Sequence, residues 1–203
     1  MKNIWLIDKG HGGFINGVYQ TAPDKMFHHS DYEIFYEGVF NRIIGDKLLR
    51  KLWDKGIYAI DLCPTELDVP LSVRVDNANN YYRAYPNAVL LSLHSNASEN
   101  HDGNGFEVWT SIGQTRSDKY AEVLAHEIMA KFEMPFRSDK ADDDLDKESQ
   151  FYILKWTHCP AVLPECLFFD NYDNYKMLSR PDFQERYVDT LVNFILKSEL
   201  VIE

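Results

Sequence analysis

Three observations in the sequence predict an α/β domain with a mostly parallel, twisted sheet and helices on both faces. Short apolar runs alternate along the chain with longer stretches whose apolar residues recur every three or four positions, which is typical of a layered α/β protein. Glycine or proline often marks the change from one pattern to the other. The chain of 203 residues is long enough to bury one core, and no linker or internal repeat divides it. We therefore expect a single domain over residues 1–203.

The elements follow from local periodicity. The first long helix carries an apolar residue at every fourth position and ends at Gly56, because glycine accepts the backbone conformation that closes a helix. Pro70 suits the first turn of the next helix, and Ser117 is the expected cap of the third. The expected strands cover 4–7, 57–62, 88–93, 105–111 and 161–169, the helices 37–55, 70–85, 117–132, 151–156 and 181–196, and two loops 14–36 and 139–148.

Composition excludes several classes of function. The net charge of −11 argues against nonspecific binding to nucleic acid or to an anionic membrane, because either needs a basic face. No apolar run approaches the roughly 20 residues of a membrane span, so no membrane insertion is expected. The amino terminus shows no signal-peptide pattern. The odd set Cys63, Cys159 and Cys166 indicates reduced thiols and synthesis in the cytoplasm.

Two histidines follow predicted strands at the same kind of position. The first strand breaks into Asp8-Lys9-Gly10-His11-Gly12-Gly13, and the strand over 88–93 ends in His94. Ligands of open α/β sheets bind at the carboxyl ends of the strands. The two imidazoles therefore suggest a metal site.

A third metal ligand is available at Glu37, where the first long helix begins. Two imidazoles and one carboxylate leave a tetrahedral zinc ion with one open position, as in catalytic zinc sites. Taken alone, Glu37 is as well explained by a favourable interaction with the helix dipole. Together with His11 and His94, it is favoured as a ligand.

Glu165 is a charged residue within the apolar segment 161–169. Charged side chains are rarely buried unless they are paired. A carboxylate at the end of this strand can serve as a general base beside a metal site. The alternative is that Glu165 pairs with a buried arginine such as Arg74, and we favour the catalytic interpretation.

These residues carry a resemblance to a known family. The order of Asp-x-Gly-His-Gly-Gly, a helix-initial Glu, Ser-x-His-x-Asn-Ala, Gly-Phe-Glu-Val and Pro-Ala-Val-Leu-x-Glu resembles the zinc-dependent N-acetylmuramoyl-L-alanine amidases of the amidase 3 type. The resemblance implies zinc held by His11, Glu37 and His94, with Glu165 as the catalytic carboxylate. It also implies hydrolysis of the amide between N-acetylmuramic acid and L-alanine in peptidoglycan.

The sequence departs from the family pattern at three positions near these motifs. Lys9 replaces a proline, Pro164 replaces a small or aliphatic residue, and Leu167 replaces a glycine. The four positions that carry the chemistry are present. The departures therefore concern loop shape and substrate fit more than the reaction.

Two other functions remain open at this point. The chain is alternatively a catalytically inactive peptidoglycan-binding module, or a zinc amidohydrolase that acts on another acylated sugar or peptide. The lack of a leader pattern suggests either a phage endolysin or a bacterial amidase whose leader or partner domain is missing. The compact single-domain form and the reduced cysteines favour the endolysin.

Other candidate motifs are weaker. His126-Glu127 begins like a metalloprotease signature, but Ala130 stands where its second histidine belongs. The acidic run that includes Asp142 resembles the start of a calcium loop, but Lys147 replaces the required glycine. The remaining histidines and thiols are read as surface or structural groups: His28, His29, His101, His158 and Cys159.

Overall fold

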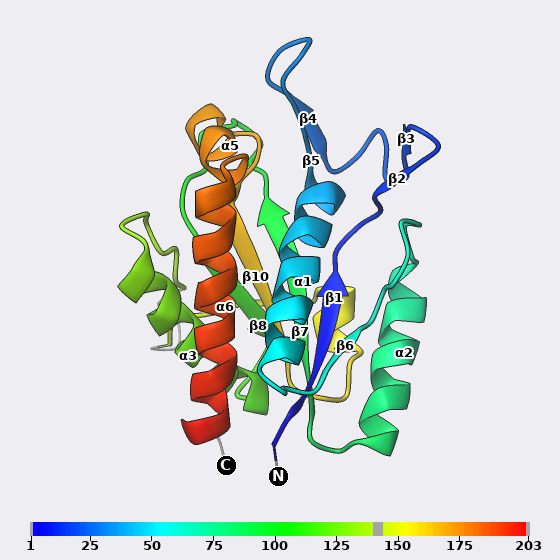
Figure 1. Cartoon of the computed structure of the whole chain (residues 1–203). Helices are drawn as coiled ribbons and strands as arrows, with labels where there is room; N and C mark the ends of the chain where they lie inside the picture. The colour runs from blue at the N-terminus through cyan, green and yellow to red at the C-terminus, as the bar shows by residue number, and fades with distance from the viewer. Residues whose placement is uncertain (1, 140–143, 202–203) are drawn as a thin grey trace.

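The computed structural model of the protein describes residues 2–139 and 144–201. A six-stranded sheet forms its centre, in the order β6-β1-β7-β10-β8-β9 (Figure 1). Only the pair β10–β8 is antiparallel among the strand pairs of this sheet. The expected mostly parallel sheet is therefore confirmed. The strands are β1 (Ile4–Lys9), β6 (Ala59–Asp61), β7 (Ala88–Asn96), β8 (Glu107–Ser111), β9 (Lys147–Ser149) and β10 (Ala161–Phe168).

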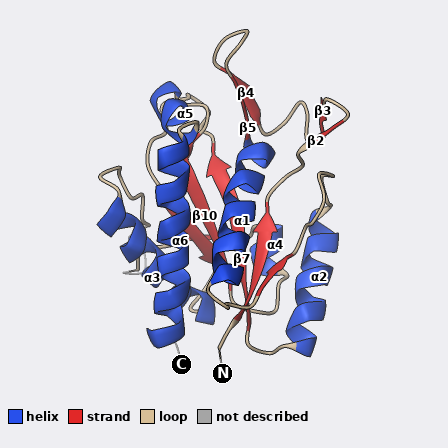
Figure 2. Ribbon diagram, viewed as in Figure 1, coloured by secondary structure: helices blue, strands red, loops and turns tan. Residues whose placement is uncertain are grey.

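Helices cover both faces of the sheet, as predicted (Figure 2). Side chains alternate between the faces along each strand, so Leu91 packs into one core and Leu90 into the other. The larger core is closed by α1 (Glu37–Asp54), α3 (Arg116–Lys131) and α6 (Pro181–Val201). The smaller core is closed by α2 (Leu71–Ala84) and α4 (Tyr152–Lys155).

The segment expected as a loop over 14–36 contains two short hairpins. They are β2 (Phe14–Ile15) with β3 (Val18–Tyr19), and β4 (Met26–His28) with β5 (Ile34–Tyr36). Strands of two or three residues are too short for a period of two to be visible in the sequence. Both hairpins lie beyond the carboxyl end of β1 (Figure 1), so the expected loop is in fact an ordered arm beside the predicted metal site.

Three further local features differ from what the sequence analysis assigned. The cap of α3 is Thr115, which forms a capping box with Asp118, whereas the hydroxyl of Ser117 accepts a hydrogen bond from the backbone of Ala161. A short helix, α5 (Tyr172–Leu178), follows the Asn171 cap in a stretch to which no element was assigned. The end of the acidic segment pairs with β8 as strand β9, and residues 140–143 of that segment lie outside the described residues.

The three cysteines are free and buried, as expected. No helix among the described residues is long and apolar enough to cross a bilayer.

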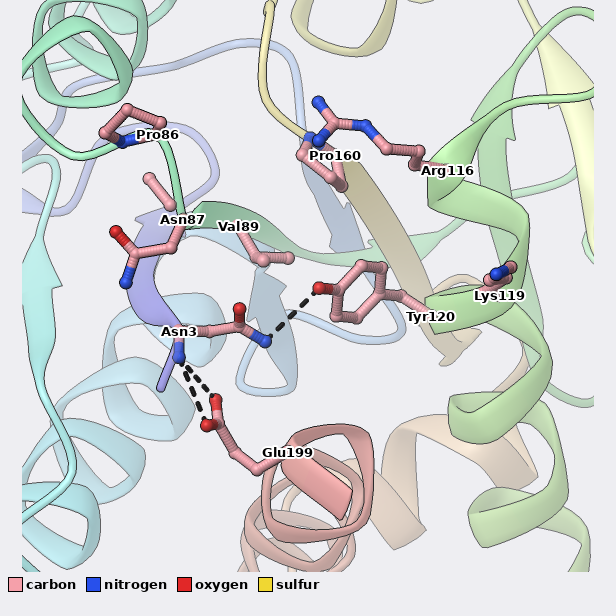
Figure 3. A pocket seen from close by; sticks show the side chains of 10 residues that line it. Asn3, Pro86, Asn87, Val89, Arg116, Lys119, Tyr120, Pro160 and Glu199 are labelled. Carbon is pink, nitrogen blue, oxygen red and sulfur yellow. Dashed lines mark hydrogen bonds between the residues drawn. The ribbon is translucent and has the colours of Figure 1, made fainter. Parts of the chain in front are cut away.

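The amino end of the sheet is joined to the last helix by polar contacts (Figure 3). The backbone nitrogen of Asn3 lies 3.0 Å from Glu199 Oε1, and the Asn3 side chain donates to the Tyr120 hydroxyl at 3.2 Å. Trp5 Nε1 also donates to Glu199 Oε1, at 3.3 Å. Asn3, Tyr120 and Glu199 line a cavity of about 470 Å³, and Arg116 also lines it. The cavity lies at the opposite end of β1 and β7 from the predicted metal ligands.

A buried ion pair fixes the carboxyl end of β1. Arg74 of α2 donates from Nη1 to Asp8 Oδ1 at 2.6 Å and to the Lys9 carbonyl at 2.9 Å. The Ser92 hydroxyl of β7 donates to the other oxygen of Asp8 at 2.6 Å. Burial opposes ionisation of Asp8, but the Arg74 charge and the Ser92 hydrogen bond outweigh it and hold the pKa of Asp8 below its usual value. The ion pair thereby joins α2, β1 and β7 at the carboxyl end of the two strands.

Replacing Arg74 with methionine leaves the Asp8 carboxylate buried without its counter-charge. We expect Arg74→Met to lower the free energy of unfolding by about 3–5 kcal/mol, measured by urea denaturation. Arg83→Met is the matched control because Arg83 lies exposed on the same helix, and we expect a change within about 0.5 kcal/mol. A loss below about 1 kcal/mol for Arg74→Met would show that the edge does not depend on this pair.

Candidate metal centre

The structure brings the three predicted metal ligands together. His11 follows β1, Glu37 is the first residue of α1, and His94 lies near the end of β7. One ligand atom from each lies within 4.8 Å of the others. Glu37 Oε1 is 2.9 Å from His94 Nδ1 and 3.3 Å from His11 Nε2. Among the described residues, this is the single cluster of three side chains suited to a metal ion.

The turn after β1 needs a glycine in order to bring the two imidazoles together. A Cβ atom at Gly10 would lie 2.4 Å from Cε1 of His94, so no larger residue fits there. His11 itself has a left-handed backbone with φ of 64°. Its carbonyl accepts hydrogen bonds from Arg42 Nη1 at 2.8 Å and from Arg74 Nη2 at 3.2 Å. Two guanidinium groups thus hold the histidine in a conformation that costs free energy.

The start of α1 is fixed by the 14–36 arm. The backbone nitrogen of Glu37 donates to the carbonyl of Lys25 at 3.0 Å, and that of Gly38 donates to the hydroxyl of Tyr19 at 2.9 Å. A Cβ atom at Gly38 would lie 1.9 Å from the carbonyl oxygen of Gly12. Only glycine therefore lets the helix approach the turn closely enough for Glu37 to reach both imidazoles.

The charge state of the cluster suits a divalent cation. Burial lowers the pKa of His11, which favours the neutral imidazole that binds metals. Burial alone would raise the pKa of Glu37, but the interactions with His11 and His94 hold it below its usual value. His11 Nε2 and Glu37 Oε2 are both buried without a hydrogen-bond partner. Buried polar atoms normally have a hydrogen-bond partner, so these two atoms are available to bind a metal ion. Two histidines and one carboxylate are a common set of metal ligands.

Glu165 lies next to this cluster on β10. Its register partner is His94 on the parallel strand β7 and Glu107 on the antiparallel strand β8. Burial raises the pKa of Glu165 well above its usual value, and the charges of Glu37 and Glu107 add to that effect. Its Oε2 atom is buried without a hydrogen-bond partner. The alternative role of Glu165 as partner of Arg74 is wrong, because Arg74 pairs with Asp8.

Two charged residues near the cluster were assigned no role from the sequence, although Glu107 belongs to the Gly-Phe-Glu-Val motif. Arg42 is buried on α1 and donates to the carbonyls of His11 and Gly38. Glu107 is buried on β8 beside Glu165. Arg42 lies among glycines and Asp46 on its helix face, and Glu107 alternates with Gly105 and Trp109, so no apolar pattern marked either residue in the sequence.

Within residues 2–139 and 144–201, the other candidates do not form a second metal cluster. His29 bonds the carbonyl of Phe169, and His101 pairs with Asp170. Burial raises the pKa of the Cys159 thiol to about 12, so it is not poised as a nucleophile. His126 is exposed, and Asp142 of the acidic run lies outside the described residues.

Comparisons with known proteins place the chain in a family. Residues 6–197 match the family Amidase_3, N-acetylmuramoyl-L-alanine amidase. A protein described as uncharacterized, YqiI of Bacillus subtilis (strain 168), is 24% identical over 189 residues, which are 93% of this chain and 81% of that protein.

Solved structures share the fold. N-acetylmuramoyl-L-alanine amidase from Clostridium difficile 630 superposes with a TM-score of 0.80 and 24% identity, over 100% of this chain and 99% of that one. The catalytic domain of the amidase CwlV from Bacillus (Paenibacillus) polymyxa var. colistinus gives a TM-score of 0.74 and 20% identity, over 99% of each chain. The match of the family along nearly the whole sequence, together with this fold, leads to one conclusion. The chain belongs to the Amidase_3 family of N-acetylmuramoyl-L-alanine amidases, which hydrolyse peptidoglycan.

Proposed function

We propose that residues 1–203 act as one zinc-dependent catalytic domain that cleaves the amide between N-acetylmuramic acid and L-alanine. The observation that carries the proposal is the convergence of His11, Glu37 and His94, whose ligand atoms lie within 4.8 Å of one another. This donor set would hold zinc and leave a coordination position for the reaction. Glu37 also accepts from the backbone nitrogen of Ser95 at 3.2 Å, which limits rotation of its carboxylate.

Zinc, when bound in such a site, makes water acidic near neutral pH and polarises a carbonyl. Glu165 takes the proton from the attacking water as the water oxygen forms a bond to the amide carbon. It then delivers that proton to the L-alanine nitrogen as the carbon–nitrogen bond breaks. The raised pKa of Glu165 suits both steps, because the carboxyl group must gain the proton and then release it.

Purified peptidoglycan provides the direct test. We expect the protein to release new amino termini and no new reducing-sugar ends, because an amide and not a glycosidic bond is cut. A chelator should abolish the release and added zinc should restore it. Mass spectra of the fragments would locate the cut.

The same assay separates the alternatives. A folded, zinc-loaded protein that binds several wall types without releasing amino termini would be the inactive binding module. Release from another acylated sugar or peptide, with none from peptidoglycan, would instead identify a different amidohydrolase. Action as a phage endolysin stays a prediction from the sequence.

Substitutions separate the base from the ligands. Glu165→Gln keeps the size of the side chain but cannot accept the proton, so we expect kcat to fall by about 10²–10⁴-fold with zinc still bound. His94→Ala removes a ligand, and we expect the bound zinc itself to be lost. Zinc content by elemental analysis and kcat by amine release are the measurements.

The control for both substitutions is His126→Ala, because His126 is exposed on α3 and outside the cluster. It should keep zinc and activity. Near-normal turnover in Glu165→Gln would exclude Glu165 as the base, and full zinc content in His94→Ala would exclude His94 as a ligand.

A further inference from the structure

Glu107 has no part in the proposed reaction, although it lies beside Glu165. Its side chain is 3% exposed, and both of its oxygens are occupied. Oε1 accepts from Arg137 Nε at 2.8 Å and from Lys147 Nζ at 2.7 Å, and Oε2 accepts from Asn96 and Trp109. A carboxylate with four donors is not free to act as a base. Two cations, Arg137 and Lys147, therefore share this one carboxylate.

The backbone around Arg137 is built to place its side chain there. The nitrogen of Phe106 donates to the carbonyl of Pro135, and the nitrogen of Arg137 donates to the carbonyl of Phe106, both at 2.8 Å. Gly105 permits this close approach, since its φ is 110° and a Cβ atom there would lie 2.2 Å from the oxygen of Pro135. The glycine of the Gly-Phe-Glu-Val motif is therefore needed for the position of Arg137.

The guanidinium of Arg137 is held on two sides but remains accessible. Its Cζ atom lies 5.2 Å from the centre of the Phe168 ring, and the side chain is 45% exposed. Glu107 engages Nε, and the two terminal nitrogens of the fork are the groups that can bind a further carboxylate. A guanidinium fixed in this way loses little conformational freedom when it binds a carboxylate.

Three side chains form a row across neighbouring strands beside the candidate metal cluster, and Arg137 lies at the Glu107 end of this row. His94, Glu165 and Glu107 are register partners on β7, β10 and β8, and register partners share one face of a sheet. Neighbouring strands lie about 4.8 Å apart, so the row from His94 to Glu107 spans roughly 10 Å. Beyond the other end of the row is a cavity of about 350 Å³, bordered by His11 and Leu71.

We propose that Arg137 binds a free carboxylate of the peptide that is joined to the scissile amide through L-alanine. This inference rests on the amidase function proposed above and identifies a residue that binds the peptide part of the substrate. Two residues of extended peptide span about 7 Å, which brings the carboxylate of the residue after L-alanine from Glu165 to the Arg137 end of the row. The protein carries a net charge of −11, so a local cation is needed to offset repulsion of an anionic peptide.

Kinetics on two matched substrates test this assignment. One is a muramoyl dipeptide whose L-alanyl-D-glutamate carries a free α-carboxylate and a γ-amide, and the other carries both carboxyl groups of the glutamate as amides. Arg137→Gln should lower kcat/KM on the carboxylate substrate about tenfold or more, mainly through KM. On the amidated substrate the variant should match the unsubstituted protein within about twofold, because no charge-assisted hydrogen bond is lost there.

Two further variants serve as controls. Arg137→Lys keeps the charge without the fork and should recover part of the loss. Arg180→Gln removes an exposed arginine that pairs with Asp182 near the start of α6. This variant should leave kcat/KM unchanged on both substrates. An equal loss on both substrates, or no loss on the carboxylate substrate, would overturn the assignment and leave Arg137 a structural partner of Glu107.

Binding without turnover keeps this test separate from the proposed function. The probe is free L-alanyl-D-glutamate with its γ-carboxyl group as an amide, titrated into zinc-loaded protein and followed by calorimetry, with circular dichroism to check that each variant is folded. Affinity at least about tenfold weaker in Arg137→Gln supports the assignment, and equal affinity overturns it. If the unsubstituted protein cleaves neither substrate, the amidase proposal fails while this titration still decides whether Arg137 binds the carboxylate.

Discussion

The edge of the sheet that carries the candidate site depends on Arg74. Its guanidinium bonds the Asp8 carboxylate, the Val69 carbonyl and two carbonyls of the turn that leads to His11. The side chain is 2% exposed, so these bonds must compensate for the cost of burying the charge. Because the same group joins α2 to β1 and to the turn, the direction of the His11 imidazole is linked to the packing of a helix.

Four carboxylates at the carboxyl end of the central strands have different environments; Asp8, Glu37 and Glu107 are buried, and Glu165 is half-buried. Asp8 has a guanidinium, Glu37 has two imidazoles, and Glu107 has two cations. Glu165 has neighbouring negative charges and one buried oxygen without a partner. The proton affinity of Glu165 is therefore raised while Asp8 and Glu37 stay ionised, which is the separation that acid–base chemistry beside a metal requires.

The departures from the family pattern are absorbed locally. Lys9 lies buried against Gly45 and pairs with Asp46 at 2.9 Å and Asp61 at 2.7 Å. Leu167, which stands where the family has glycine, has a left-handed backbone with φ of 57° and lies in the irregular stretch of β10 after Glu165. The backbone shape that glycine would provide is thus kept at the cost of strain.

Sequence patterns were sufficient to predict the layered architecture and the residues of the candidate metal cluster. Apolar periodicity is set by burial along each element, so the long helices and strands were visible, and glycines beside His11 marked the turn. The short hairpins of the 14–36 arm and helix α5 were not visible, because elements of a few residues are stabilised by contacts with the rest of the fold. Two ion pairs became visible only in the folded protein. Arg74 pairs with Asp8 and not with Glu165, and Arg137 pairs with Glu107. An ion pair forms only between side chains that the fold brings close together, and the distance between two side chains cannot be read from a single sequence.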